Sequence, residues 1–66
     1  MGSVAKVIEV IAEGKTIEEA VEKAAKEASK SLKNVKSVYV EGIKAAVEDG
    51  EIKNYRVNAK VTFVIE

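Results

Sequence analysis

The fold is decided by the last twelve residues of the chain, which read Tyr55-Arg56-Val57-Asn58-Ala59-Lys60-Val61-Thr62-Phe63-Val64-Ile65-Glu66. Apolar residues occupy every odd position from 55 to 65, even positions 56 to 62 are polar, and only Val64 breaks the alternation. Because successive side chains of a strand point to opposite faces, this pattern predicts a strand with one apolar and one polar face. The apolar face directs folding, and the polar face is where a function is to be sought.

A hairpin joins this strand to the segment before it. Asp49-Gly50 is a strong signal for a two-residue type I′ turn, which needs positive φ at both central residues. The segment from about Lys36 to Glu48 is therefore predicted to be extended, and the final strand to begin at Glu51 or Ile52. The turn predicts five cross-strand pairs: Glu48 with Glu51, Ala46 with Lys53, Ile43 with Arg56, Glu41 with Asn58, and Ser37 with Thr62.

The pairing assigns side chains to the two faces of the sheet, since cross-strand partners share a face. The polar side is expected to hold Ser37, Tyr39, Glu41 and Ile43 together with Arg56, Asn58, Lys60 and Thr62. The apolar side is expected to hold Val38, Val40 and Ala46. Gly42 in mid-strand indicates a bulge or bend.

A strand and a helix precede the hairpin. Val4 to Ala12 is rich in β-branched residues and mostly apolar on both faces, which predicts a strand with neighbours on both faces. Thr16-Ile17-Glu18-Glu19 is a capping box that starts a helix from Ile17 to about Lys33. Its apolar stripe is mostly alanine and can lie close to a sheet: Ile17, Ala20, Val21, Ala24, Ala25, Ala28 and Leu32. The order of elements is β-α-β-β.

Length and composition exclude several functions. A chain of 66 residues buries only roughly 60% of its unfolded surface, so such domains rely on disulfides, metals or oligomerisation. The absence of Cys and His excludes disulfides, thiolate metal sites and the commonest general base. With 11 basic and 11 acidic residues, the chain lacks the basic excess of a nucleic-acid binder. No apolar run is long enough for a membrane and no signal peptide opens the chain, so we expect a cytoplasmic, self-associating protein that is not an enzyme.

The chain resembles the dodecin family over essentially its whole length. Beyond the order of elements, the resemblance rests on Val4-Ala5-Lys6-Val7-Ile8-Glu9-Val10, the helix leading into Ser31-Leu32, the turn Asp49-Gly50, and Tyr55-Arg56-Val57, Lys60-Val61, Phe63 and Ile65-Glu66. Dodecins wrap a curved three-stranded antiparallel sheet partly around one helix, and twelve copies form a hollow sphere. The resemblance thus implies an α+β domain spanning residues 1–66, assembled as a homododecamer whose polar sheet face lines the interior.

The resemblance also implies a ligand and the residues that contact it. Flavin-binding dodecins hold paired isoalloxazine rings of FMN or riboflavin for storage or photoprotection, without catalysing a reaction. They stack a Trp where this chain has Ser37 and hydrogen-bond the ring with a Gln where it has Arg56. In some members two Arg hold the phosphate, where this chain has Lys44 and Val64. We therefore expect flavin to bind weakly or not at all, because the aromatic stack and the amide acceptor are missing.

The candidate cofactor-binding residues are Ser37, Tyr39, Lys44 and Arg56. Tyr39 could supply a stacking surface, although a strand Tyr more often packs at an interface. Arg56 either contacts a ligand inside the assembly or, as the favoured interpretation, forms an ion pair between subunits with Glu41 or Glu9.

Acidic residues offer a second function, since some dodecin-like proteins without the Trp bind calcium. Six carboxylates could form Ca²⁺ or other metal sites when repeated by symmetry: Glu9, Glu13, Glu41, Glu48, Asp49 and Glu51. No loop has the ligand spacing of an EF-hand, so metal ligands stay unassigned. Two hypotheses remain: a homododecamer that stores a small molecule, and a calcium-binding or purely structural assembly.

Overall fold

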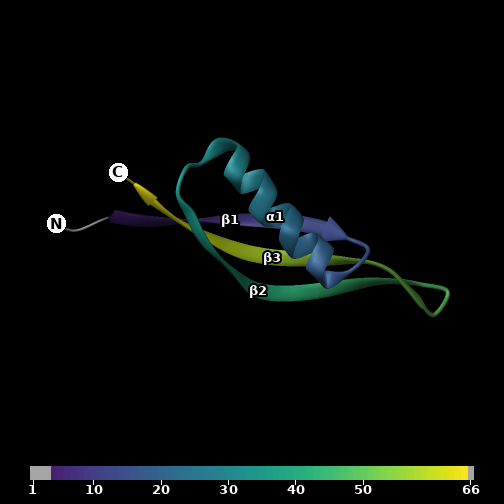
Figure 1. Cartoon of the computed structure of the whole chain (residues 1–66). Helices are drawn as coiled ribbons and strands as arrows, with labels where there is room; N and C mark the ends of the chain where they lie inside the picture. The colour runs from purple at the N-terminus through teal and green to yellow at the C-terminus, as the bar shows by residue number, and fades with distance from the viewer. Residues whose placement is uncertain (1–3, 66) are drawn as a thin grey trace.

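The computed structural model describes residues 4–65 and confirms the predicted order of elements (Figure 1). Strand β1 spans Val4–Gly14, helix α1 spans Ile17–Ser31, and strands β2 and β3 span Val35–Glu48 and Glu51–Ile65. The three strands form one antiparallel sheet in the order β1-β3-β2. The alternating strand that ends the chain is therefore the central strand, paired on both sides.

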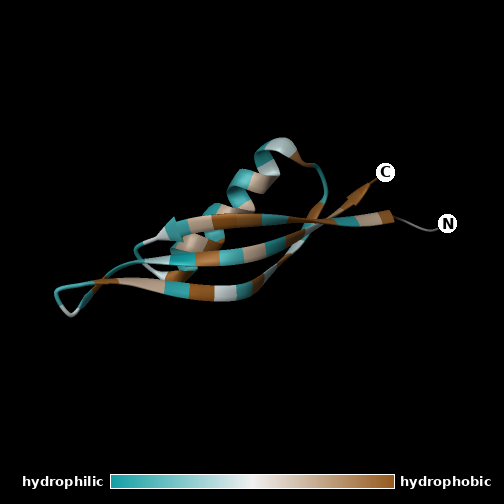
Figure 2. Ribbon diagram, turned by 180° about the vertical axis from the view of Figure 1, so that it is seen from behind, coloured by the Kyte–Doolittle hydropathy of each residue, from teal (hydrophilic) through white to brown (hydrophobic). Residues whose placement is uncertain are grey.

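The molecule is long and thin, with principal extents of 55 × 19 × 13 Å. Helix α1 covers one face of the sheet, and the β2–β3 hairpin projects beyond the start of the helix (Figure 1). Figure 2 shows the molecule from behind, with the sheet in front of the helix, and hydrophobic and hydrophilic residues alternate along much of the strands. Residues 1–3 and Glu66, which the predicted domain includes, lie outside the described residues.

A tight turn between β1 and α1 fixes where the helix begins. The side-chain oxygen of Thr16 accepts a hydrogen bond from the Glu19 backbone N–H at 3.0 Å, as the capping box predicts. The Glu19 carboxylate accepts from the N–H of Lys15 at 2.6 Å, one residue earlier than in a standard capping box. Gly14 permits this approach, because a Cβ there would lie 2.7 Å from the backbone nitrogen of Ala20.

The connection after the helix is tied to the end of β3. The helix ends two residues before the predicted Lys33. Leu32 adopts an extended backbone, although its N–H still donates to the Ala28 carbonyl at 2.9 Å. Asn34 has a φ of 62°, a left-handed conformation that Asn tolerates better than most residues. Its carbonyl accepts a hydrogen bond from the Val64 N–H at 3.1 Å.

Small side chains build the core between α1 and the sheet. In the part of the chain that the structure describes, six apolar residues are buried, three from the helix and three from β3: Ala20, Ala24, Ala28, Val57, Ala59 and Val61. They confirm the centre of the predicted helix stripe and the apolar face of the last strand. The flanking stripe residues Val21, Ala25 and Leu32 are only partly buried, and Ile17 is exposed. The single chain thus covers only part of its apolar surface.

The register between β2 and β3 agrees with the prediction at the first and last predicted pairs, and shifts beyond them between Val35 and Ser37. Glu48 lies opposite Glu51, and both central residues of the turn have positive φ, 54° and 77°. Ser37 lies opposite Thr62, also as predicted. In between, the register shifts at Ala46/Val47 and again at Val40/Gly42, so the bulge predicted at Gly42 is confirmed. The two shifts have opposite sign and cancel.

Between the two bulges the predicted pairs are wrong by one residue. Observed partners there are Ala46 and Asn54, Ala45 and Tyr55, Lys44 and Arg56, Ile43 and Val57, and Gly42 and Asn58. A slip of one residue transfers side chains to the other face. Lys44, rather than Ile43, therefore lies opposite Arg56. On the helix side, Ala45 takes the place predicted for Ala46, and Ile43 joins it.

Candidate functional site

The sheet face opposite α1, called the open face below, carries the candidate residues. A side chain is assigned to this face when its cross-strand partner is one of the even-numbered β3 residues between 56 and 62, because partners share a face. Its members are Val7, Glu9, Ile11 and Glu13 from β1, Ser37, Tyr39, Gly42 and Lys44 from β2, and Arg56, Asn58, Lys60 and Thr62 from β3, with Glu41 at the bulge. The four predicted cofactor-binding residues thus share one face of the sheet.

These four residues do not form one cluster. Ser37 lies opposite Thr62 and Tyr39 opposite Lys60, whereas Lys44 and Arg56 face each other beyond the Gly42 bulge. Thr62 and Arg56 are six residues apart on β3, which is about 20 Å at roughly 3.3 Å per residue. The structure therefore brings Lys44 and Arg56 together, and separates this pair from Ser37.

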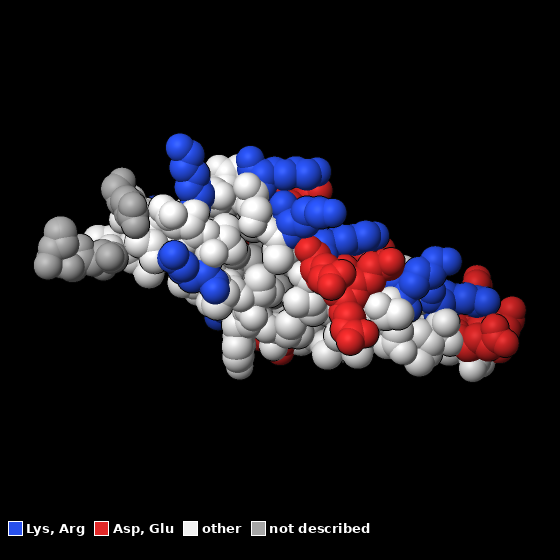
Figure 3. All heavy atoms as spheres, in the orientation of Figure 1, with Lys and Arg blue, Asp and Glu red and all other residues white. Residues whose placement is uncertain are grey.

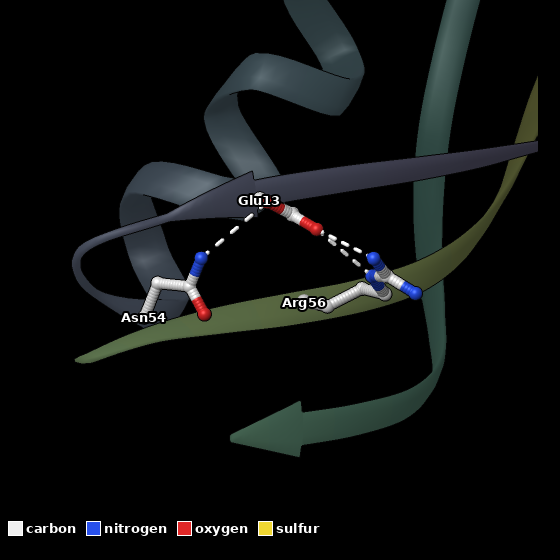
Figure 4. A network of polar contacts seen from close by, with 3 residues as sticks. All are labelled: Glu13, Asn54 and Arg56. Atoms are coloured by element: carbon white, nitrogen blue, oxygen red, sulfur yellow. Dashed lines mark hydrogen bonds and ion pairs between the residues drawn. The ribbon is translucent and has the colours of Figure 1, made fainter. Parts of the chain in front are cut away.

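A carboxylate of the same chain holds Arg56 (Figure 4). Arg56 Nε and Nη2 donate to Glu13 Oε2 at 3.0 and 2.7 Å. Asn54 Nδ2 donates to the other carboxylate oxygen, Glu13 Oε1, at 3.4 Å. Within the chain, Arg56 thus forms an ion pair with Glu13, and the predicted pair with Glu41 or Glu9 of another subunit stays a prediction. Glu41 instead pairs with Lys60, with 3.5 Å between Oε2 and Nζ.

The Glu13–Arg56 pair changes what Arg56 offers to a ligand. It engages two of the five N–H donors of the guanidinium and neutralises its charge locally. Lys44, opposite Arg56, has no ion pair with any residue between 4 and 65. Like charges directly opposite each other destabilise a sheet, and Glu13 compensates only one of the two. Glu13, Arg56 and Lys44 together carry a net charge of +1.

A hollow of about 210 Å³ lies near the middle of the open face. Its lining is formed by Glu9, Val10, Ile11, Glu41, Asn58 and Ala59. Gly42 lies opposite Asn58, and a Cβ on Gly42 would meet nothing within 4 Å. The hollow contains none of the four predicted cofactor-binding residues. The only signal for it in the sequence is Gly42, because the hollow lies beside the bulge.

The acidic residues do not gather into a metal centre in the part of the chain that the structure describes. No group of three or more acidic side chains there could hold an ion. Glu9 and Glu41 share the hollow, while Glu13 is bound to Arg56. The predicted calcium site therefore depends on carboxylates from different subunits.

Charges of both signs cover the helix side of the molecule. Figure 3 shows basic side chains gathered along the helix, with acidic ones near its start and at the tip of the hairpin. Glu18 and Glu19 in the first turn and Lys30 in the last turn complement the helix dipole. Within residues 4–65, no helix has the length and apolar character needed to cross a membrane.

Large apolar side chains stay uncovered on both faces of the sheet and along the hairpin. More than half of the surface is exposed for Val4, Val7, Ile11, Tyr39, Ile43, Val47 and Ile52. Apolar surface of this extent marks an interaction site, since monomeric proteins rarely expose large contiguous apolar patches.

Comparison with known proteins agrees with this fold. The dodecin family model matches residues 4–66, and the chain belongs to the dodecin family. An Arg-to-Ala variant of the Thermus thermophilus dodecin is 27% identical, with a TM-score of 0.91 and 98% of each chain covered. The Streptomyces coelicolor dodecin is 26% identical, with a TM-score of 0.89, covering 97% of this chain and 93% of that one. The Streptomyces davaonensis dodecin, 21% identical with a TM-score of 0.91, covers 100% and 98% and supports the fold alone. No curated protein sequence matches.

Family membership has direct consequences for function. Dodecins are small non-enzymatic proteins that bind flavin and self-assemble into oligomers, so membership implies a small flavin-binding or storage protein. The predicted family and the predicted α+β fold, three antiparallel strands on one helix, are confirmed. Solved structures of the T. thermophilus dodecin include a Trp-to-Phe variant, whereas this chain contains no Trp.

Proposed function

We propose that the chain forms a hollow homododecamer that sequesters a small ligand on its open face, without catalysis, and that flavin binds weakly or not at all. Family membership and the exposed apolar side chains on both faces of the sheet support the assembly. Among residues 4–65 the core has six buried apolar residues, all Ala or Val. Contacts between subunits would supply the burial that so small a domain lacks.

The Arg56–Glu13 pair is the observation that carries the weak-flavin part of the proposal. The resemblance aligns Arg56 with the Gln that hydrogen-bonds the flavin ring in relatives. An amide both donates and accepts, whereas a guanidinium only donates, and two of its donors are already bound to Glu13. A ring edge that needs an acceptor would find none in Arg56.

Ser37 accounts for the loss of a second flavin contact, the aromatic stack. It is exposed opposite Thr62, so two short polar side chains occupy the row where relatives stack a Trp. A missing aromatic pair removes about 0.5–1.5 kcal/mol beyond area burial, which corresponds to roughly 2- to 13-fold in affinity. Tyr39 lies in the neighbouring row, opposite Lys60, and not in the row of Ser37 itself.

Quenching of flavin fluorescence tests the proposal. Protein is titrated into riboflavin and into FMN, and the unmodified chain is expected to show no stoichiometric quenching at micromolar concentration. The double variant Ser37→Trp/Arg56→Gln restores the stacking ring and the amide, and is expected to quench both flavins. Submicromolar stoichiometric quenching by the unmodified chain would contradict the proposal.

A further inference from the structure

We propose that Glu13 determines how strongly the open face binds anionic ligands, because it neutralises Arg56 and engages its guanidinium in two hydrogen bonds. The inference rests on the proposed function, in which a small ligand binds to the open face. It assigns a specificity-determining role to a residue outside the predicted cofactor-binding set.

Three charged residues form one row across the sheet. Glu13 on β1 lies opposite Arg56 on β3, and Arg56 lies opposite Lys44 on β2. Cα atoms of such neighbours are about 4.5–5.5 Å apart, so the long side chains can reach a common ligand. Both hydrogen bonds of Arg56 run to Glu13 Oε2, and Figure 4 shows the guanidinium directed towards β1. Asn54 holds the other carboxylate oxygen and so keeps Glu13 in place.

The row would behave differently if Glu13 carried no charge. Arg56 and Lys44 would then be two adjacent cations, and an oxyanion could bridge them. A planar guanidinium binds phosphate through two parallel hydrogen bonds, and an ammonium adds a point charge. With Glu13 ionised, Lys44 alone is uncompensated, since the next cation along β3, Lys60, pairs with Glu41. The native face therefore offers a phosphate ester one free cation instead of two, and binds it more weakly than a face without the Glu13 charge would.

The competing interpretation is that the Glu13–Arg56 pair serves only to join β1 to β3. The two strands already pair from Val4–Ile65 to Gly14–Tyr55. The side chains of Glu13 and Arg56 are each 48% exposed, so solvent screens their attraction. A purely structural role would change stability without changing the affinity for a phosphate ligand.

Calorimetric titration with inorganic pyrophosphate at low ionic strength separates the two roles. The assembled full-length chain is compared with three variants: Glu13→Gln, Glu13→Gln/Lys44→Gln and Glu9→Gln. Glu13→Gln is expected to bind pyrophosphate at least tenfold more tightly than the unmodified chain, and the double variant is expected to lose this gain. Glu9→Gln is the matched control, because it removes the same charge from the same face and strand without releasing Arg56.

Equal affinity of the unmodified chain and Glu13→Gln, including no binding by either, would overturn the inference. So would an equal gain in Glu9→Gln, because net charge alone would then explain the effect. If Glu13→Gln does not assemble, Glu13→Ala takes its place, since it also removes the carboxylate from Arg56 and must also tighten pyrophosphate binding. Pyrophosphate has no flavin ring, so this result and that of the flavin titration succeed or fail separately.

Discussion

The ion pair between Glu13 and Arg56 makes a stability contribution that can be calculated from its geometry. Two hydrogen bonds of 3.0 and 2.7 Å join the side chains, and each side chain is 48% exposed. Exposed pairs contribute about 0.2–1 kcal/mol. Because two donors reach one carboxylate oxygen and Asn54 holds the other, we expect the upper half of this range, about 0.5–1 kcal/mol per chain. The Lys60–Glu41 pair, with one contact of 3.5 Å, provides the comparison.

A double-mutant cycle measures this coupling free energy. The cycle uses Arg56→Gln, Glu13→Gln and the double variant, and the reference cycle uses Lys60→Gln and Glu41→Gln. Thermal unfolding is followed at one fixed protomer concentration, because assembly makes Tm depend on concentration. A coupling of about 0.5–1 kcal/mol corresponds to roughly 2–8 °C in a domain of this size.

Salt provides the internal control for the cycle, since added electrolyte screens exposed charges. The coupling free energy is expected to shrink when the salt concentration is raised from about 0.05 to about 0.5 M, because the Debye length falls below about 10 Å over this range. A coupling of zero at low salt would refute the reasoning, as would one no larger than that of Lys60 and Glu41.

The remaining predictions concern the fold. Gly14→Ala is expected to destabilise the protein by about 1–3 kcal/mol, because the new Cβ would lie 2.7 Å from a backbone nitrogen and a hydrogen bond at the helix start would be lost. Gly42→Ala, with nothing within 4 Å of the new Cβ, should stabilise it by about 0.5 kcal/mol. If both substitutions shift Tm equally, the structure around these glycines is wrong. Ala24→Leu should cost about 1–3 kcal/mol by overpacking the helix–sheet contact, whereas Ser29→Leu on the exposed side of α1 should cost less. An unchanged Tm for Ala24→Leu would contradict the close contact.

Sequence alone predicts the elements of this fold well, because their signals are local. The alternation from Tyr55 to Ile65 defines the central strand, and the Asp49-Gly50 turn defines the hairpin. The capping box at Thr16 correctly predicts Ile17 as the first residue of the helix. The helix end is two residues short of the prediction because Leu32 takes an extended backbone, and helix ends carry the weakest local signals.

The register between the bulges could not be predicted, because the sequence there is ambiguous. Ile43, Ala45 and Ala46 are all apolar, so either register places an apolar residue of this stretch on the helix side. Only the pairing shows that Lys44 faces Arg56. Gly42 indicated the bulge near the middle of β2. Nothing in the sequence indicated the second register shift, at Ala46 and Val47, which cancels the first.

The ion-pair partner of Arg56 could not be predicted from the sequence either. Strands β1 and β3 are joined by no hairpin, since a helix and β2 lie between them along the chain. Their register therefore depends on long-range packing, and nothing local distinguishes Glu13 from Glu9 as the residue opposite Arg56. Alternation predicted the open face and most of its members correctly, but it placed Ile43 there where the structure has Lys44, and the contacts within the face required the structure.

The mass of the particle in solution tests the central claim most directly. Light scattering coupled to size-exclusion chromatography measures it without labels or ligands. The account predicts twelve copies of the 7.1 kDa chain, which is about 85 kDa, because only assembly covers the apolar side chains that one chain leaves exposed. A stable monomer of 7.1 kDa would contradict the account.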